Sequence, residues 1–261
     1  MIGIFDSGLG GLTAVKELHT LSPGEAIVYF GDTGRVPYGT RSESTIVKYA
    51  KQDTAFLLSQ GVDAILVACG TVSTTALSAL KQTVSLPIIG VVEPAAASAV
   101  CATKNNRIAV IGTSATVRSD AFAKEIRRLA PFAEVLSVAC PLFVPLVENG
   151  FTAPDCDITR LTCEHYLASI RDFGADTLIL GCTHYPLIAE VIASVLPRVT
   201  LISAGAEAAR RVAALCGIKA APSVEPRYYV SDDPSLFTAS ASLFLGHDLT
   251  GQVEKIDIER Y

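Results

Sequence analysis

Short runs of aliphatic and β-branched residues alternate with amphipathic segments along the whole chain. The apolar runs have the length of strands and contain few polar positions, which is typical of strands buried on both faces. Between them, residues 10–21, 43–60 and 119–130 repeat their apolar positions with helical spacing. Strands that alternate with helices predict an α/β fold with mainly parallel sheets. The predicted strands are residues 2–5, 26–30, 64–68, 87–91, 107–112, 134–139, 177–181, 199–203 and 228–231.

The order of these elements repeats. The strand "IGIF" leads into "DSG" at the start of the chain, and "RIAVIG" leads into "TS" in its middle. Each opening is followed further on by a strand that ends in a cysteine, in "AILVACGT" and "TLILGCTH". Strand–helix units recur in any α/β protein, but the matched cysteines favour an internal duplication. We therefore predict two pseudo-symmetric α/β domains, residues 1–95 plus 206–261 and residues 96–205, with the active site at their interface.

Composition narrows the class of protein. Half of the 261 residues are hydrophobic, yet no apolar run reaches the roughly 18 residues that a membrane span needs. The N-terminal residues lack the basic segment and apolar core of a signal peptide. A net charge of −5 without clusters of lysine or arginine argues against nucleic acid as a partner. We expect a cytoplasmic protein that binds neither membranes nor nucleic acid.

The chain contains seven cysteines. An odd number, with no C-x-x-C pair and no Cys/His spacing suited to zinc, argues against a disulfide framework and against a metal site. Cys69 and Cys182 each follow a predicted strand and precede a predicted helix. The other five are expected to be small buried hydrophobic residues: Cys101, Cys140, Cys156, Cys163 and Cys216.

The positions of Cys69 and Cys182 indicate a reaction class. Ligands of α/β sheets bind beyond the carboxyl ends of the strands, where helix N-termini attract carboxylates and favour a thiolate. Inversion of a stereocentre requires that a proton leave one face of a carbon and that another arrive on the opposite face. Two opposed thiols can do both, with Asp6 assisting Cys69, and His184 assisting Cys182 together with Glu148. Each of these residues also has a plainer interpretation, as a helix cap, a packing residue or a loop carboxylate.

Five segments resemble the glutamate racemases, the cofactor-independent enzymes that supply D-glutamate for peptidoglycan. They are "FDSGLGGLT", "VPYG", "GVVEP", "PLVENG" and above all "GCTHYPLI", and the resemblance runs in order from residue 2 to about residue 250. Related aspartate racemases typically have glutamate where His184 stands, so this histidine favours the glutamate branch.

The resemblance implies roles for individual residues. Cys69 and Cys182 become the proton donors and acceptors, Asp6 and His184 their assisting groups, and Glu148 a further polar helper. No metal or cofactor is implied, the partner is glutamate, and a homodimer is an assembly that the family often forms. The implied substrate contacts are Asp6, Ser7, Pro37, Tyr38, Gly39, Gly70, Thr71, Thr113, Thr116, Thr183 and His184.

One departure from the family concerns Gly70. Family members usually read Cys-Asn-Thr at the first cysteine, whereas this chain reads Cys69-Gly70-Thr71. The missing amide predicts one or more lost hydrogen bonds to the substrate, each worth roughly 0.5–1.5 kcal/mol. From the sequence we expect Gly70→Asn to tighten glutamate binding. The chain also lacks the N-terminal extension of members activated by a cell-wall precursor, so that regulation is not expected.

Four alternatives remain open at this point. A dinucleotide-binding oxidoreductase would use Gly8 and Gly10 with Asp32 as the ribose partner, but Thr13 stands where the third glycine of that fingerprint belongs. A racemase dependent on pyridoxal phosphate would need a Schiff-base lysine, and none of the lysines lies in a persuasive strand-end motif. The third is a non-catalytic module that binds acidic amino acids. The fourth is an aspartate racemase.

Overall fold

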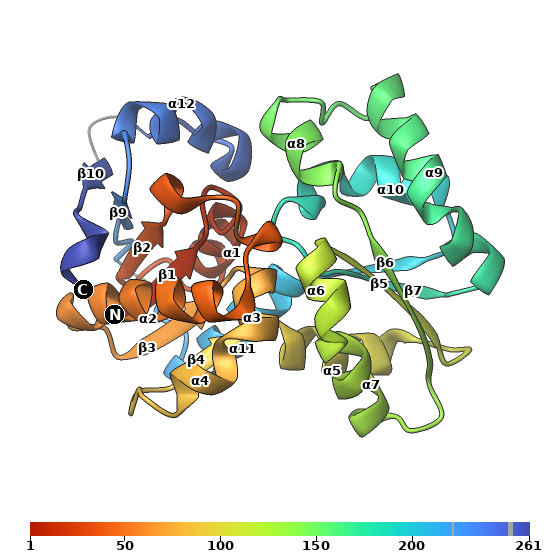
Figure 1. The fold of residues 1–261 in the computed structure, drawn as a ribbon, viewed down its shortest axis with the longest axis horizontal. Helices are drawn as coiled ribbons and strands as arrows, with labels where there is room; N and C mark the ends of the chain where they lie inside the picture. The colour runs from red at the N-terminus through yellow and green to blue at the C-terminus, as the bar shows by residue number, and fades with distance from the viewer. Residues whose placement is uncertain (221, 250–252) are drawn as a thin grey trace.

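The computed structural model describes residues 1–220, 222–249 and 253–261, and in it the chain forms two halves that lie side by side (Figure 1). Each half is built on one sheet, and every strand pairing in both sheets is parallel. Both chain ends lie on the first half. The predicted α/β class, with parallel sheets flanked by helices, is confirmed.

The first sheet has the strand order β10-β9-β2-β1-β3-β4. β1 lies inside it, where Ile4 pairs with Tyr29 of β2 on one side and with Leu66 of β3 on the other. Every residue of these three strands is buried, as expected for a parallel sheet covered by helices on both faces. The strands are β1 (Ile2–Asp6), β2 (Ile27–Gly31), β3 (Ala64–Val67), β4 (Ile88–Gly90), β9 (Arg227–Val230) and β10 (Val253–Lys255).

The second sheet repeats the arrangement of the first. Its strand order is β6-β5-β7-β8, and the first four strands of the chain follow the matching order β2-β1-β3-β4. β5 therefore corresponds to β1, and β7 corresponds to β3. The two cysteine turns follow these corresponding strands β3 and β7, which is the repeat visible in the sequence. The strands are β5 (Arg107–Gly112), β6 (Glu134–Ala139), β7 (Thr177–Leu180) and β8 (Thr200–Ser203).

Helices cover both sheets, and the three helical segments predicted from periodicity appear as α1, α2 and α7. The α-helices are α1 (Leu12–Leu21), α2 (Glu43–Ser59), α3 (Gly70–Thr75), α4 (Leu77–Lys81), α5 (Val92–Ala102), α6 (Ser114–Ser119), α7 (Ala121–Leu129), α8 (Phe143–Glu148), α9 (Asp157–Phe173), α10 (Ala189–Val195), α11 (Ala204–Cys216) and α12 (Pro234–Leu245). Four 3₁₀ helices are η1 (Thr33–Arg35), η2 (Tyr38–Thr40), η3 (Tyr185–Ile188) and η4 (Ile258–Arg260). Within the described ranges, no helix has both the length and the apolar character of a membrane span.

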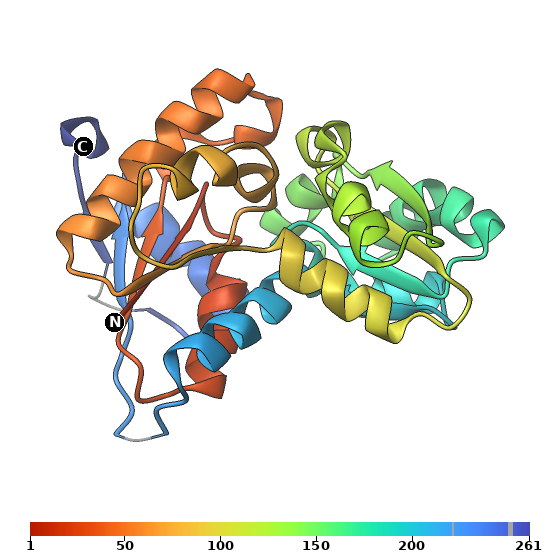
Figure 2. The ribbon, with the colours of Figure 1, turned by 90° about the horizontal axis from the view of Figure 1, so that it is seen from below.

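The chain passes between the two halves twice. α5, yellow in Figure 2, leads into the second half, and α11 leads back to the first, where β9 and β10 complete the sheet. The two helices pack against each other near the passage. Residues 95 and 206, the domain boundaries predicted from the sequence, fall within these two helices, and the boundaries themselves stay a prediction.

All nine predicted strands are present, to within one or two residues at their ends. β10 was not predicted. This strand has only three residues, "VEK", which are mostly exposed at the edge of the first sheet. It therefore shows no alternation of buried and exposed positions. The predicted helix after the second cysteine is also only partly correct, because the chain first forms η3 and continues into α10 after it.

Candidate active site

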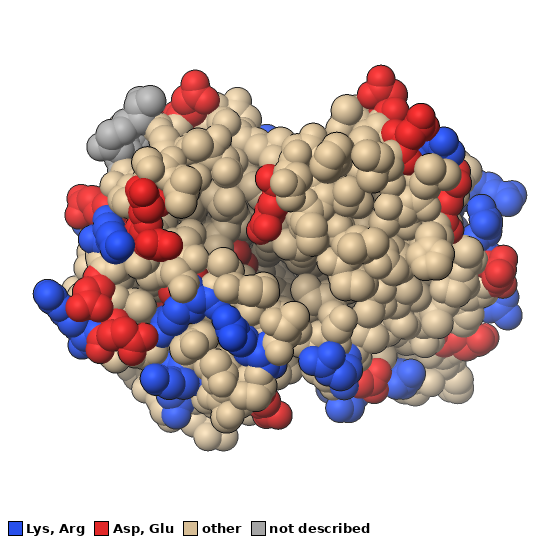
Figure 3. Space-filling view, turned by 45° about the horizontal axis from the view of Figure 1, so that its top comes forward, with Lys and Arg blue, Asp and Glu red and all other residues tan. Residues whose placement is uncertain are grey.

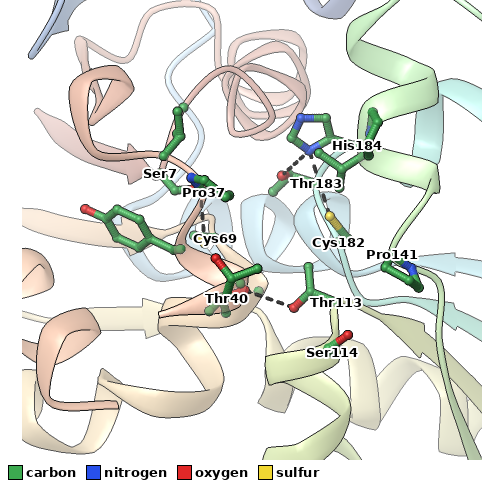
Figure 4. A pocket seen from close by; sticks show the side chains of 18 of the residues that line it. Ser7, Pro37, Thr40, Cys69, Thr113, Ser114, Pro141, Cys182, Thr183 and His184 are labelled. Atoms are coloured by element: carbon green, nitrogen blue, oxygen red, sulfur yellow. Dashed lines mark hydrogen bonds between the residues drawn. The ribbon is translucent and has the colours of Figure 1, made fainter. Parts of the chain in front are cut away.

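A cavity of ≈ 400 Å³ opens between the two halves, at the carboxyl ends of both sheets. In the space-filling view it is the hollow between the two halves (Figure 3), and Figure 4 shows it from close by. Most of the predicted site residues line it, and they come from both halves: Ser7, Pro37, Tyr38, Gly39, Cys69, Gly70, Thr71, Thr113, Glu148, Cys182, Thr183 and His184. Asp6 and Thr116 are the two predicted contacts outside this lining.

Cys69 lies at the point where β3 passes into α3, and it is the residue before the first turn of that helix. Its side chain is buried, and its thiol donates a hydrogen bond to Ser7 Oγ at 3.7 Å. Burial raises the pKa of Cys69 to about 12, and the nearby charges of Asp6 and Cys182 act in the same direction. Cys69 is therefore a protonated thiol at neutral pH, ready to donate.

Cys182 lies after β7 in the second half, and its sulfur is 3.8 Å from His184 Nδ1. The other ring nitrogen of His184, Nε2, is 3.0 Å from Glu148 Oε1. Burial by itself lowers the pKa of His184, but hydrogen bonds to Cys182 and Glu148 and the charges of Cys182 and Asp6 together raise it to about 10. His184 is thus an imidazolium at neutral pH. It lies between the carboxylate of Glu148 and the sulfur of Cys182, and the contact with the sulfur is drawn in Figure 4.

Asp6 ends β1 and lies behind the cavity wall rather than on it. It is 1% exposed, and its Oδ2 accepts a hydrogen bond from the Gly8 backbone at 3.1 Å. Its Oδ1 has no hydrogen-bond partner among the described residues. Burial raises the pKa of Asp6, while the charge of His184 and backbone hydrogen bonds pull it down. Asp6 acts on the cavity through its charge, which raises the pKa of both Cys69 and His184.

Threonine hydroxyls line one side of the cavity and link the two halves. Thr71 Oγ1 of the first half is 3.1 Å from Thr113 Oγ1 of the second, and Thr113 Oγ1 is 3.0 Å from Thr116 Oγ1. Thr113 also caps α6 by accepting from the Thr116 backbone at 3.2 Å. Thr116 is therefore a support behind Thr113. These hydroxyls can bind carboxylate oxygens without adding net charge, and no lysine or arginine is present among the described residues that line the cavity.

The loop that carries Pro37, Tyr38 and Gly39 is held by a cluster that sequence reasoning missed. Arg35 Nε is 2.6 Å from Asp32 Oδ2, and its Nη2 is 2.9 Å from Asp53 Oδ1. The hydroxyl of Tyr38 donates to both carboxylates, so it points into the first half rather than toward a ligand. Burial raises the pKa values of Tyr38 and Asp53. The ring of Tyr38 lines the cavity, and its polar end is used for positioning.

This cluster also removes the dinucleotide alternative. Asp32, the ribose partner in that interpretation, is fully buried and bound by Arg35, Tyr38 and Ser231. Gly10, the second glycine of the fingerprint, faces Thr183 and His184 of the other half. Neither residue is available to a cofactor, so the glycine-rich stretch serves packing between the halves.

The surroundings of Gly70 change the effect that is expected of the substitution Gly70→Asn. A Cβ built on Gly70 would lie 2.2 Å from the backbone oxygen of Gly181, in the other half. The space that a side chain would need is therefore filled by backbone and not by water or substrate. Gly70→Asn would force the two cysteine turns apart, so the expectation that it tightens glutamate binding is withdrawn.

Several residues that line the cavity were not predicted. The unpredicted lining residues are Gly8, Val36, Thr40, Ser114, Cys140, Pro141, Val144, Pro145 and Gly181. Most of them directly adjoin a predicted residue, and that proximity in the sequence was the available signal.

The other five cysteines differ in burial. The expectation that they are buried packing residues holds for Cys140 and Cys163, is wrong for the exposed Cys101, and is only partly right for Cys156 and Cys216.

The model of the family described as "Asp/Glu/Hydantoin racemase" matches residues 13–212. The chain belongs to this family. The glutamate racemase of Geobacter metallireducens is 46% identical, over 99% of this chain and 97% of that protein. The glutamate racemase of Chlorobium phaeobacteroides is 47% identical, over 98% of this chain and 96% of that one.

Solved structures place the chain in the same group of racemases. The crystal structure of glutamate racemase from Francisella tularensis in complex with D-glutamate superposes with a TM-score of 0.92 at 38% identity, covering 100% of this chain and 98% of that one. An aspartate racemase of Picrophilus torridus is 18% identical with a TM-score of 0.63, and this likeness concerns the fold alone.

Proposed function

We propose that this protein is a glutamate racemase, an isomerase that interconverts L- and D-glutamate by proton transfer between Cα and the thiols of Cys69 and Cys182. The observation that carries the proposal is the pair of buried cysteines that face one cavity from corresponding strands of the two halves. Full-length similarity to glutamate racemases at 46% identity supports glutamate as the substrate.

The proposed reaction has two proton transfers. A thiolate on one face of glutamate takes the Cα proton, and the electron pair of the broken C–H bond stays on Cα and its carboxylate. The thiol on the other face then delivers its proton to Cα, which forms the new C–H bond with inverted configuration. The two sulfurs have exchanged protonation states at the end. Because Cα is a very weak acid, both transfers depend on a preorganised site that excludes water.

The neighbours of each sulfur fit this cycle. Cys69 rests as a thiol because burial and the Asp6 charge raise its pKa to about 12. Negative charge on Cys182 is balanced by the imidazolium of His184, 3.8 Å away. Glu148 holds the far side of the imidazole at 3.0 Å and fixes its orientation. The hydroxyls of Thr71 and Thr113, 3.1 Å apart, would donate hydrogen bonds to a carboxylate of the substrate.

In the cell this activity would supply D-glutamate for peptidoglycan synthesis from the cytoplasm, without metal or organic cofactor. Among the described residues, no three His, Cys, Asp or Glu side chains are grouped as metal ligands. The proton transfers assigned above need only the side chains of the chain itself.

Incubation of the purified, dialysed protein with L-glutamate in deuterated water tests the proposal. We expect D-glutamate by circular dichroism and deuterium at Cα by proton NMR, in the same sample and without added cofactor. L-Aspartate in a parallel sample separates the two acidic substrates. If neither deuterium nor D-glutamate forms while a known racemase works in the same buffer, the proposal fails. Faster inversion of aspartate would reassign the substrate.

A further inference from the structure

The turn that carries Cys182 and His184 lies against two glycines of the opposite half. A Cβ on Gly10 would lie 2.1 Å from Thr183 Oγ1 and 2.6 Å from His184 Nδ1. A Cβ on Gly70 would lie 2.2 Å from the Gly181 backbone oxygen. Cβ atoms in proteins essentially never lie within 3.0 Å of a heavy atom from a residue that is not their neighbour in the chain. A Cβ therefore fits at Gly70 only if backbone moves, and at Gly10 only if the side chains of Thr183 and His184 move.

Within its own half, the turn is firmly held. The Gly181 backbone donates to Ile111 O at 2.8 Å, and the hydroxyl of Tyr185 donates to Cys140 O at 3.0 Å. Across the gap, the hydroxyl of Thr13 donates to Thr183 O at 3.2 Å. A methyl group on Gly70 would meet the backbone of Gly181, which is held in place, so it must push the two cysteine turns apart. A methyl group on Gly10 would meet the side chains of Thr183 and His184 and must displace them.

We propose that Gly10 and Gly70 form a seat for residues 181–184, and that this seat sets the separation of the two reacting sulfurs. Gly70 directly follows Cys69, and Gly181 directly precedes Cys182, so their contact joins the two cysteine turns backbone to backbone. Gly10 supports the other end of the same turn, beside His184. Both glycines are positioning residues, since neither touches a reacting atom. The inference rests on the two-thiol function proposed above.

The separation matters because one substrate carbon must be within reach of both sulfurs in turn. If the far thiol is displaced, the carbanion is reprotonated by the thiol that made it, on the same face. Solvent hydrogen then enters Cα without inversion. A misplacement of about 1 Å can cost on the order of 100-fold in rate. If the two cysteine turns move apart, exchange of the Cα hydrogen with solvent should therefore remain faster than inversion at Cα.

Gly70→Ala is the direct test, with Gly10→Ala as an independent second variant. In deuterated water we expect inversion to fall on the order of 100-fold in both variants. From the enantiomer whose proton Cys69 removes, exchange with retention should fall much less, so the ratio of exchange to inversion rises at least tenfold. Gly205→Ala is the matched control, because a Cβ there has its nearest neighbour at an ordinary 3.8 Å, and it should leave both rates unchanged.

A readout independent of turnover is alkylation by iodoacetamide, measured for each cysteine by peptide mass spectrometry. With the seat open, Cys182 should be alkylated severalfold faster than in the wild type, at unchanged circular dichroism. Equal loss of exchange and inversion, wild-type inversion in both variants, or unchanged alkylation of Cys182 would each overturn the seat. Loss of the cooperative unfolding transition in both variants would overturn it too, because the glycines would then serve folding. Failure of the proposed function would instead show in the wild type, which would neither exchange nor invert.

Discussion

The two cysteine turns occupy corresponding places in the two halves but have different surroundings. Cys69 donates to a neutral hydroxyl, that of Ser7, and has the buried carboxylate of Asp6 in its neighbourhood. Cys182 has the imidazole of His184 beside it, backed by Glu148. The first environment disfavours negative charge on sulfur, and the second offers a cation to balance it. The backbone repeats, whereas the electrostatics do not.

This difference shows how a symmetric scaffold can serve an asymmetric starting state. A racemase must invert both enantiomers, so it needs one thiol and one thiolate at the start of each turnover, and the two must trade places. If the surroundings of the two sulfurs were identical, nothing would fix which one begins protonated. Here the raised pKa of Cys69 keeps that sulfur protonated at rest, and the imidazolium of His184 lies beside the other sulfur.

The largest expected effect comes from removing either sulfur. Cys69→Ala and Cys182→Ala should each reduce inversion by about 10²- to 10⁴-fold, the usual contribution of a general acid or base. The rate at which the optical rotation of glutamate changes, compared at equal protein concentration, measures the loss. The control is Cys163→Ala, which removes a buried thiol from α9. If both alanine variants unfold while the serine variants stay fully active, the two cysteines serve packing only.

A smaller effect should follow the loss of the imidazolium. His184→Asn removes the positive charge beside Cys182 and should lower kcat/KM about 100-fold. The two enantiomers have equal free energy, so kcat/KM must fall equally in both directions. The asymmetry of the site should instead appear in the isotope effect of Cα-deuterated substrate, which should rise for only one enantiomer.

Isotope effects that change alike for L- and D-glutamate would contradict the assignment of His184 to one sulfur. The control is Glu148→Gln, which keeps the hydrogen-bonding shape beside Nε2 and removes the carboxylate charge. It should act in the same direction as His184→Asn and more weakly, since Glu148 acts through the imidazole.

The smallest effect concerns the pH dependence of Cys69 itself. Only the thiolate is alkylated, and a pKa of about 12 keeps Cys69 protonated at neutral pH. Its alkylation rate should therefore rise about tenfold for each unit of pH between 7 and 10, whereas a free thiol levels off near pH 8.5. Asp6→Asn removes a charge that raises this pKa, so the variant should react faster at any given pH. A plateau for wild-type Cys69 below pH 9 would contradict the asymmetry of the two sulfurs.

Much of the fold could be read from the sequence because buried parallel strands are local features. Each is a short, nearly uninterrupted apolar run, as in residues 64–68 or 177–181, and needs no knowledge of its partners. The positions of Cys69 and Cys182 followed from the rule that ligands bind at the carboxyl ends of strands. β10 escaped because a short polar edge strand has no such pattern.

The support of the site could not be predicted, because it depends on side chains distant in the sequence. Arg35 joins Asp32 to Asp53 and also approaches Glu259 at 3.3 Å, near the end of the chain. Nothing in the local sequence of Arg35 indicates these partners. The fit of Gly70 against Gly181 is similarly non-local, and there the sequence led to the wrong expectation for an asparagine.

The placement of β9 and β10 beside β2 has a consequence for synthesis of the protein. These strands follow the whole second half in the sequence, so a ribosome releases β1 to β4 well before the strands that cover the edge of β2. Until then that edge presents unpaired backbone groups, which are a template for association with other chains. The first half therefore keeps one edge of its sheet unpaired until the last part of its own chain is translated.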